Sequence, residues 1–174
     1  MSTPPSHLIA RSIACDSPAF AELSRAILGA GKSLRFQARG ISMAPLVRDG
    51  DILTVEPVTA PQLGVGDLAL FRRGPEAVVA HRVIRIEAGP QGRRFLMQGD
   101  AVPHPDGWIA EEAIYGRVSA LEREGARLEL ARPAMRALCW LAVLRSRHGL
   151  RHGPLVRLAG RLVRRLPPFS RYLA

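Results

Sequence analysis

Three short segments of this sequence contain the residue types that nucleophilic catalysis at a serine requires. Ser42 lies in the segment Gly40-Ile41-Ser42-Met43-Ala44-Pro45, His81 lies within an apolar run, and Asp100 and Asp106 follow a later apolar run. A serine hydroxyl is a poor nucleophile unless an adjacent base removes its proton. An imidazole can be that base, and a carboxylate can orient the imidazole and stabilise its protonated form. Taken singly, each of these residues is more typical of a turn or of a structural position.

The order of these segments resembles that of the signal peptidase I family of serine peptidases. The nucleophile motif of that family, G-x-S-M-x-P followed closely by G-D, corresponds to residues 40–45 and Gly50-Asp51. The resemblance covers residues 33–120, and the ordered set of motifs is far more specific than any single one. The remaining motifs correspond, in family order, to Gly66-Asp67, His81-Arg82-Val83, Gly99-Asp100 with Asp106, and Gly116-Arg117-Val118.

The resemblance implies that Ser42 is the nucleophile and that His81 is the general base. Bacterial housekeeping signal peptidases and the related repressor autopeptidases use a lysine, but the only lysine here, Lys32, lies ten residues before Ser42. A serine–histidine pair is typical of the endoplasmic-reticulum and archaeal branch of the family. An imidazole titrates near neutral pH, which suits proton transfer. His104, in a loop flanked by prolines, is the weaker candidate for the base.

The resemblance also implies that Asp106 orients His81 and that Asp100 braces the same corner of the site. The sequence alone allows these two acids to exchange roles. The nucleophile loop, Gly40, Ser42 and Met43, is expected to hold the oxyanion through backbone N–H groups, because Gly40 lacks the hydroxyl that some relatives have at its position.

The other motif residues are interpreted as structural. Besides belonging to the nucleophile loop, Met43 is expected to pack in the core. We expect Pro45 to stiffen its turn, and Asp51 and Asp67 to hold turns together. No cluster in the sequence has the ligand set of a metal site, and the two cysteines match no zinc spacing. We therefore expect neither a metal nor an organic cofactor.

Short strands must position these residues. From Leu34 to about residue 130, short apolar runs are separated by Gly, Pro and Asp, which indicates strands and turns. Without intervening helices, this pattern predicts a mainly β fold, a coiled antiparallel sheet or small barrel of the signal-peptidase-like type. The expected strands are residues 34–39, 51–57, 67–72, 77–87, 93–98, 113–122 and 126–131.

A helix is expected before this sheet and two are expected after it. Asp16-Ser17-Pro18 is typical of a helix start, and Gly29 is typical of a helix end. The later helices are expected near residues 134–147 and 154–166. The apolar face of the first helix is expected to consist of Phe20, Leu23, Ile27 and Leu28.

The length of 174 residues is that of one domain. We divide it into an N-terminal leader and helix (1–32), a catalytic β domain (33–131) and an Arg-rich helical tail (132–174). The formal net charge is +10, but residues 1–130 contain 15 basic and 15 acidic residues, whereas residues 131–174 contain ten arginines and no acid. The balanced charge of the body, and the scarcity of aromatic residues in the tail, argue against nucleic acid as a partner.

The tail predicts peripheral contact with a membrane. Its Leu and Val residues recur at helical spacing with Arg between them, as in helices that lie in a membrane interface. The alternative is a pair of helices that pack on the β domain. No apolar run is long enough to cross a bilayer or to form a secretory signal. We therefore expect a cytoplasmic or peripheral membrane protein.

The resemblance predicts a serine endopeptidase that cleaves a peptide bond in a protein or peptide precursor, as in signal peptide processing. Typical signal peptidases have one or more N-terminal membrane spans, and the absence of such a span is the main departure from the family. The alternative, from a different functional class, is a non-catalytic or self-processing member that uses the same sheet as a peptide-binding or regulatory module.

Overall fold

The computed structural model describes residues 18–75, 77–131 and Val143. These residues are mainly β, with helix α1 (Pro18–Gly29) before the strands and two single turns of 3-10 helix, η1 (Ala60–Gln62) and η2 (Glu111–Ala113), between them. The strands are β1 (Leu34–Gln37), β2 (Ile52–Glu56), β3 (Leu68–Arg73), β4 (Ala77–Gly89), β5 (Gly92–Gln98), β6 (Gly107–Ala110), β7 (Ile114–Arg123) and β8 (Ala126–Glu129).

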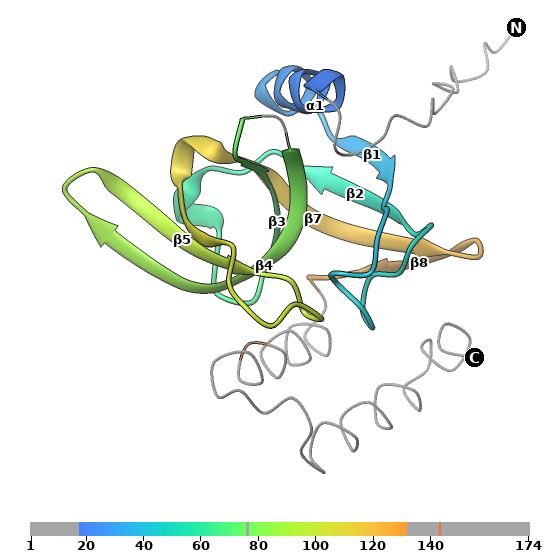
Figure 1. Cartoon of the computed structure of the whole chain (residues 1–174). Coiled ribbons are helices and arrows are strands. Elements are labelled where there is room, and N and C mark those ends of the chain that lie inside the picture. Colours follow the sequence, from blue (N-terminus) through green and yellow to red (C-terminus); the bar gives the residue numbers. More distant parts are fainter. Residues whose placement is uncertain (1–17, 76, 132–142, 144–174) are drawn as a thin grey trace, which may run out of the picture.

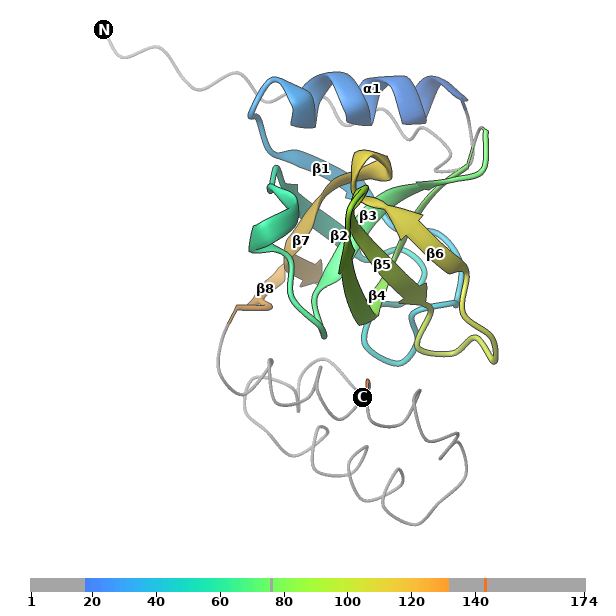
Figure 2. The ribbon, with the colours of Figure 1, turned by 90° about the vertical axis from the view of Figure 1, so that its left-hand side faces the viewer.

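The strands form one antiparallel sheet that curls into a half-barrel (Figures 1 and 2). Their order across the sheet is β1-β2-β7-β3-β4-β5-β6, and β8 pairs with β7. The pairing is irregular at Thr54/Val55, at Leu70/Phe71 and between Val83 and Arg85. Such bulges bend a strand and increase its twist, which favours the curl. The prediction of a mainly β fold with a coiled antiparallel sheet is therefore confirmed.

Strand β3 illustrates why the apolar runs of the sequence are continuous. Side chains alternate between the faces of a strand, so Leu68 and Leu70 face one core cluster while Ala69 and Phe71 face another, which also contains Phe95. All five side chains are buried. Burial of an aromatic side chain such as Phe71 contributes about 2 to 3 kcal/mol to stability. The sheet is thus stabilised on both of its faces.

Helix α1 packs on the sheet through Phe20, Ser24 and Leu28, which are all buried. The rings of Phe20 and Phe36 on β1 meet edge to face, with their centroids 5.1 Å apart. The expectation that Leu23 belongs to the buried face is wrong, because its side chain is 39% exposed. Spacing by four residues turns Ser24 rather than Leu23 toward the sheet.

The predicted elements differ from the structure in one strand and in several boundaries. Strand β6 was not expected, because it has only four residues and follows the proline-containing segment 101–106; it pairs with β5. The helices expected near residues 134–147 and 154–166 lie outside the described residues, apart from Val143. Within the described part of the chain, no helix has the length and apolar composition that a membrane crossing requires.

Two loops that carry motif residues lie at the end of the half-barrel away from α1 (Figures 1 and 2). One loop joins β1 to β2 and contains Ser42, and the other joins β5 to β6 and contains Asp106. The backbone N–H of Ala101 donates to the carbonyl of Ser42 at 2.8 Å and ties the loops together. The sheet therefore brings distant parts of the sequence to one end.

Candidate active site

The loop that carries Ser42 is fixed by a glycine at its start and by a buried side chain. Gly40 has a φ of +90°, in the left-handed region that favours glycine, and its N–H donates to Asp49 Oδ1 at 2.7 Å. Met43 is 5% exposed and packs in the core, as expected from the sequence. Ile41, on the other side of Ser42, is 76% exposed. Ser42 therefore lies between an anchored residue and an open surface.

The register of β3 and β4 places His81 on the face that carries Phe71. His81 lies opposite Ala69, whose small side chain leaves room for an imidazole beside it. Phe71 is two residues further along β3, on the same face, and its ring meets that of His81 edge to face at 6.2 Å between centroids. His81 is 3% exposed. These contacts hold the imidazole in one plane in the protein interior.

Ser42, His81 and Asp106 form a continuous hydrogen-bonded chain. His81 Nε2 lies 2.9 Å from Ser42 Oγ, and His81 Nδ1 lies 2.6 Å from Asp106 Oδ2. The sequence predicted an approach of about 3 Å between the hydroxyl and the imidazole. With its proton on Nδ1, the imidazole donates to the carboxylate and leaves Nε2 able to accept the serine proton. This is the order of nucleophile, base and orienting acid in serine hydrolases.

Asp106 is ionised although its side chain is only 5% exposed. Burial would raise the pKa of this carboxyl, but hydrogen bonds from His81 and Arg73, together with their positive charges, hold the pKa below its ordinary value. Arg73 Nη1 donates to Oδ1 at 3.0 Å, so each carboxylate oxygen has its own partner. The N–H of Asp106 donates to the carbonyl of Met97 at 2.8 Å and fixes the residue just before β6.

Asp100 pairs with Arg82, and this pairing separates the roles of the two acids. Arg82 Nε and Nη2 donate to the two carboxylate oxygens of Asp100 at 2.7 and 2.6 Å, and Arg82 Nη1 donates to the Gly66 carbonyl at 2.7 Å. The Arg82 and Asp100 side chains are 1% and 4% exposed. Asp106 thus lies in the position that orients His81, whereas Asp100 braces the next residue along β4.

Gly99 lies where β5 enters the second loop, against both Ser42 and His81. A Cβ atom at this position would lie 2.7 Å from the carbonyl oxygen of Ser42, 2.8 Å from Cγ2 of Val102 and 3.1 Å from Nε2 of His81. Real Cβ atoms essentially never approach backbone oxygen this closely. The glycine therefore lets the two loops come into contact around the imidazole.

The remaining motif acids hold turns, in agreement with their structural interpretation. Asp51 accepts hydrogen bonds from Nε and Nη2 of Arg123 at 2.8 and 2.7 Å and from the N–H of Arg48 at 2.7 Å. Asp67 accepts from the N–H of Gly64 at 2.9 Å. The partner Arg123 lies on β7, 72 residues from Asp51, and no sequence motif indicated it.

The other candidates for the base lie on the surface. Lys32 and His104 are both exposed. The side-chain partner of the Ser42 hydroxyl among the described residues is His81. Arg73 is the site residue that sequence reasoning missed. The alternation from Ala69 to Arg73 puts it on the His81 face, but this signal requires the pairing of β3 with β4 to be known.

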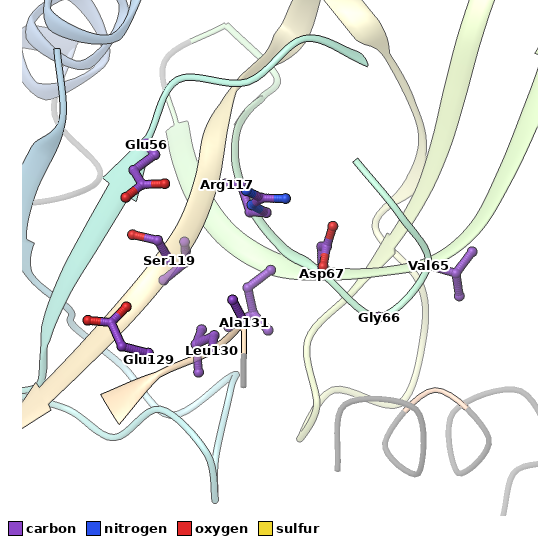
Figure 3. A pocket seen from close by; sticks show the side chains of 11 residues that line it. Glu56, Val65, Gly66, Asp67, Arg117, Ser119, Glu129, Leu130 and Ala131 are labelled. Atoms are coloured by element: carbon purple, nitrogen blue, oxygen red, sulfur yellow. The ribbon is translucent and has the colours of Figure 1, made fainter. Parts of the chain in front are cut away.

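A pocket of about 200 Å³ lies elsewhere, bordered by β2, β7, β8 and the turn before β3 (Figure 3). Glu56, Asp67 and Arg117 contribute charged side chains to it, and no member of the Ser42–His81–Asp106 chain lines it. Its volume is below that of usual small-molecule sites. Across residues 18–75 and 77–131, no three His, Cys, Asp or Glu side chains are grouped as metal ligands would be.

Comparison of the sequence with protein-family models gives no match, and neither does comparison with curated proteins.

Proposed function

We propose that this protein is a serine endopeptidase of the signal peptidase I type, which cleaves a peptide bond in a protein or peptide precursor. The observation that carries the proposal is the hydrogen-bonded chain from Ser42 through His81 to Asp106, with distances of 2.9 and 2.6 Å. A serine in a structural turn has no need of an imidazole that is buried, oriented by a carboxylate and directed at its hydroxyl. These are the features by which a histidine activates a serine nucleophile.

In the proposed acylation, Ser42 Oγ attacks the carbonyl carbon of the scissile bond while His81 Nε2 takes the hydroxyl proton. The carboxylate of Asp106 stabilises the imidazolium that forms. Nε2 then gives this proton to the leaving amine, the C–N bond breaks, and an ester to Ser42 remains. His81 next deprotonates a water molecule that hydrolyses the ester and restores the Ser42 hydroxyl.

The oxyanion of the tetrahedral intermediate needs hydrogen-bond donors close to Ser42. The N–H of Gly40 donates to Asp49, and the N–H of Ala44 donates to the Ile41 carbonyl at 3.1 Å. None of the hydrogen bonds within the described residues uses the N–H of Ser42. We assign the oxyanion to this backbone group, for which one donor typically lowers the barrier by about 3 kcal/mol. Gly40 contributes loop conformation instead.

The substrate class rests on the resemblance of the motifs to the signal peptidase I family. The curled antiparallel sheet supports it, because Ser42, His81 and Asp106, which come from three different motifs, contact one another at one end of the half-barrel. Gly99 packs on Ser42 and His81, and Arg82 links Asp100 to the turn at Gly66. A chance set of short motifs would not be expected to meet in this way.

We also propose that residues 132–174 hold the protein at an anionic membrane surface. This proposal rests on sequence alone: the segment contains ten arginines, no acid, and apolar residues at helical spacing. Each arginine near an anionic surface contributes on the order of 1 kcal/mol at best. A peptidase of this type gains by staying near a bilayer, where precursor segments emerge.

The proposal is tested by labelling the purified full chain with a fluorescent fluorophosphonate and by measuring the mass of the adduct. We expect one adduct on Ser42, no labelling of Ser42→Ala, and strongly reduced labelling of His81→Ala. Lys32→Ala is the matched control and should label at the rate of the wild-type chain, because Lys32 is exposed. Labelling that persists in Ser42→Ala, or that requires Lys32, would exclude this active site.

A further inference from the structure

We propose that Arg73 is a positioning residue of the active site, which fixes the Asp106 carboxylate and through it the orientation of His81 toward Ser42. The inference deepens the proposed function and rests on it for its catalytic meaning. The geometric part, a coupling of Arg73 to His81 through Asp106, can be measured independently of any peptidase activity.

The strand register explains how Arg73 reaches the site. Ala69, Phe71 and Arg73 alternate onto one face of β3, and this is the face on which His81 lies opposite Ala69. Arg73 is the last residue of β3 and is paired with Ala77. Its long side chain spans the remaining distance, and Nη1 lies 3.0 Å from Oδ1 of Asp106.

The two oxygens of Asp106 divide between two hydrogen-bond donors from different strands. Oδ2 faces Nδ1 of His81 from β4, and Oδ1 faces Arg73 from β3. A carboxylate that is held at both oxygens cannot rotate about its Cβ–Cγ bond without losing one of these contacts. Because the plane of the carboxylate sets the direction of the bond to Nδ1, Arg73 indirectly sets the orientation of the imidazole toward Ser42.

The charge of Arg73 acts on the imidazole with a definite sign. A guanidinium repels an imidazolium, so the sign of its charge fixes the direction of the change that is expected when a variant removes it. The other charged pair beside the imidazole, Arg82 with Asp100, is neutral as a pair. His104, in the same loop as Asp106, is exposed. Arg73 is therefore the cation, among the described residues, whose side chain contacts the Asp106–His81 pair directly.

The effect is moderate because the Arg73 side chain is 49% exposed, whereas that of Asp106 is 5% exposed. Solvent screens a half-exposed cation, and such ion pairs typically contribute a fraction of a pH unit. Removal of the charge should favour the imidazolium, and the neutral base would then be reached only at higher pH. The acid limb of kcat/KM should move up by about half a pH unit, which corresponds to about a threefold loss below its midpoint.

The chain offers a matched control in the adjacent residue. Arg72 is exposed, lies next to Arg73 on β3, and alternates onto the opposite face. Arg72→Gln removes the same charge as Arg73→Gln at nearly the same place in the sequence, but without the contact to Asp106. Arg73→Lys keeps the charge and alters the geometry.

The test is a pH titration of the His81 ring by nuclear magnetic resonance in the full chain, alongside the pH dependence of peptide cleavage and a thermal melt of each variant. We expect Arg73→Gln to raise the pH of half-protonation by about half a unit, Arg72→Gln to leave it unchanged, and Arg73→Lys to keep most of the wild-type behaviour.

Three outcomes separate this inference from the proposed function. An unchanged ring titration in Arg73→Gln would overturn the role of Arg73, even if the wild-type chain cleaves peptides. An equal change in Arg73→Gln and Arg72→Gln would overturn it as well, because the effect would then be one of net charge. If the titration moves only in Arg73→Gln while Ser42 neither labels nor cleaves, the coupling stands and the peptidase proposal fails.

Discussion

Arg82 and Asp100 form a bidentate ion pair in the protein interior, one residue away from His81 along β4. The two bonds measure 2.7 and 2.6 Å, and a third bond from Arg82 reaches the Gly66 carbonyl. The ion pair therefore links β4, the strand of His81, to the loop that precedes Asp106 and to the turn before β3.

Loss of one member of this pair should destabilise the whole fold. Asp100→Asn leaves a buried guanidinium without its counter-charge, and such changes cost about 3 to 5 kcal/mol of unfolding free energy. Urea denaturation with a common m-value measures this loss. Glu87→Gln is the control, because Glu87 pairs with Arg85 and Arg94 on the surface and should cost less than about 1 kcal/mol. Equal losses in the two variants would contradict the structural role of Asp100.

Asp106→Asn should have the opposite profile, with a large loss of activity and a small loss of stability. The amide preserves the shape of the side chain, but it removes the charge that stabilises the imidazolium and can select the wrong tautomer of His81. If the proposed function holds, serine peptidases with this chain of residues lead us to expect that kcat/KM falls by about 10³- to 10⁴-fold. Steady-state cleavage of a reporter peptide measures this loss. A variant that retains activity within tenfold would remove Asp106 from the catalytic chain.

The lowered pKa of Asp106 also predicts how its contribution to stability depends on pH. A carboxyl whose pKa is lower in the folded state than in the unfolded chain binds protons more weakly when folded. Its stabilising contribution is complete above the unfolded value of about 4 and is lost as the pH falls through the lower folded value. The difference in unfolding free energy between the wild-type chain and Asp106→Asn should therefore be constant near neutral pH and shrink toward pH 3. A difference that grows on acidification would reverse the assigned direction.

Gly99→Ala should impair catalysis through steric displacement alone. The added methyl group would clash with the backbone of Ser42 and press on Nε2 of His81, and a shift of about 1 Å in a catalytic group can cost 10²-fold in rate. Gly89→Ala is the matched control, since no atom lies within 4 Å of the corresponding Cβ position. Fluorophosphonate labelling rates of the two variants measure the difference. Wild-type labelling by Gly99→Ala would mean that the loops can separate without consequence.

The sequence predicts the site better than the details of the fold. Ser42, His81 and the two acids can be found because each belongs to a short motif, and the order of the motifs is informative. The choice between Asp106 and Asp100 needs the loop conformation, since both acids follow β5 within a few residues. Arg73 and Arg123 belong to none of the motifs. Their roles could not be predicted, because only the pairing of the strands brings them close to Asp106 and Asp51. Strand β6 has four residues, too few for a clear alternation.

The membrane proposal predicts that the intact chain co-sediments with vesicles rich in phosphatidylglycerol and not with neutral phosphatidylcholine vesicles. Because the attraction is partly electrostatic, binding should weaken between 0.1 and 1 M salt, over which the Debye length falls from about 10 to 3 Å. Replacement of four tail arginines by glutamine should reduce binding. The replaced residues are Arg157, Arg161, Arg164 and Arg165.

A variant with the same net charge tests whether this binding belongs to the tail. Four exposed arginines of the described residues are replaced by glutamine, so that the total charge equals that of the tail variant while residues 132–174 stay intact. Binding close to that of the wild-type chain is expected, because the body contains as many acids as bases and the attraction depends on local charge density. Equal losses in both variants would show a response to net charge, and wild-type binding in both would exclude an electrostatic role for the tail. The replaced residues are Arg25, Arg72, Arg85 and Arg94.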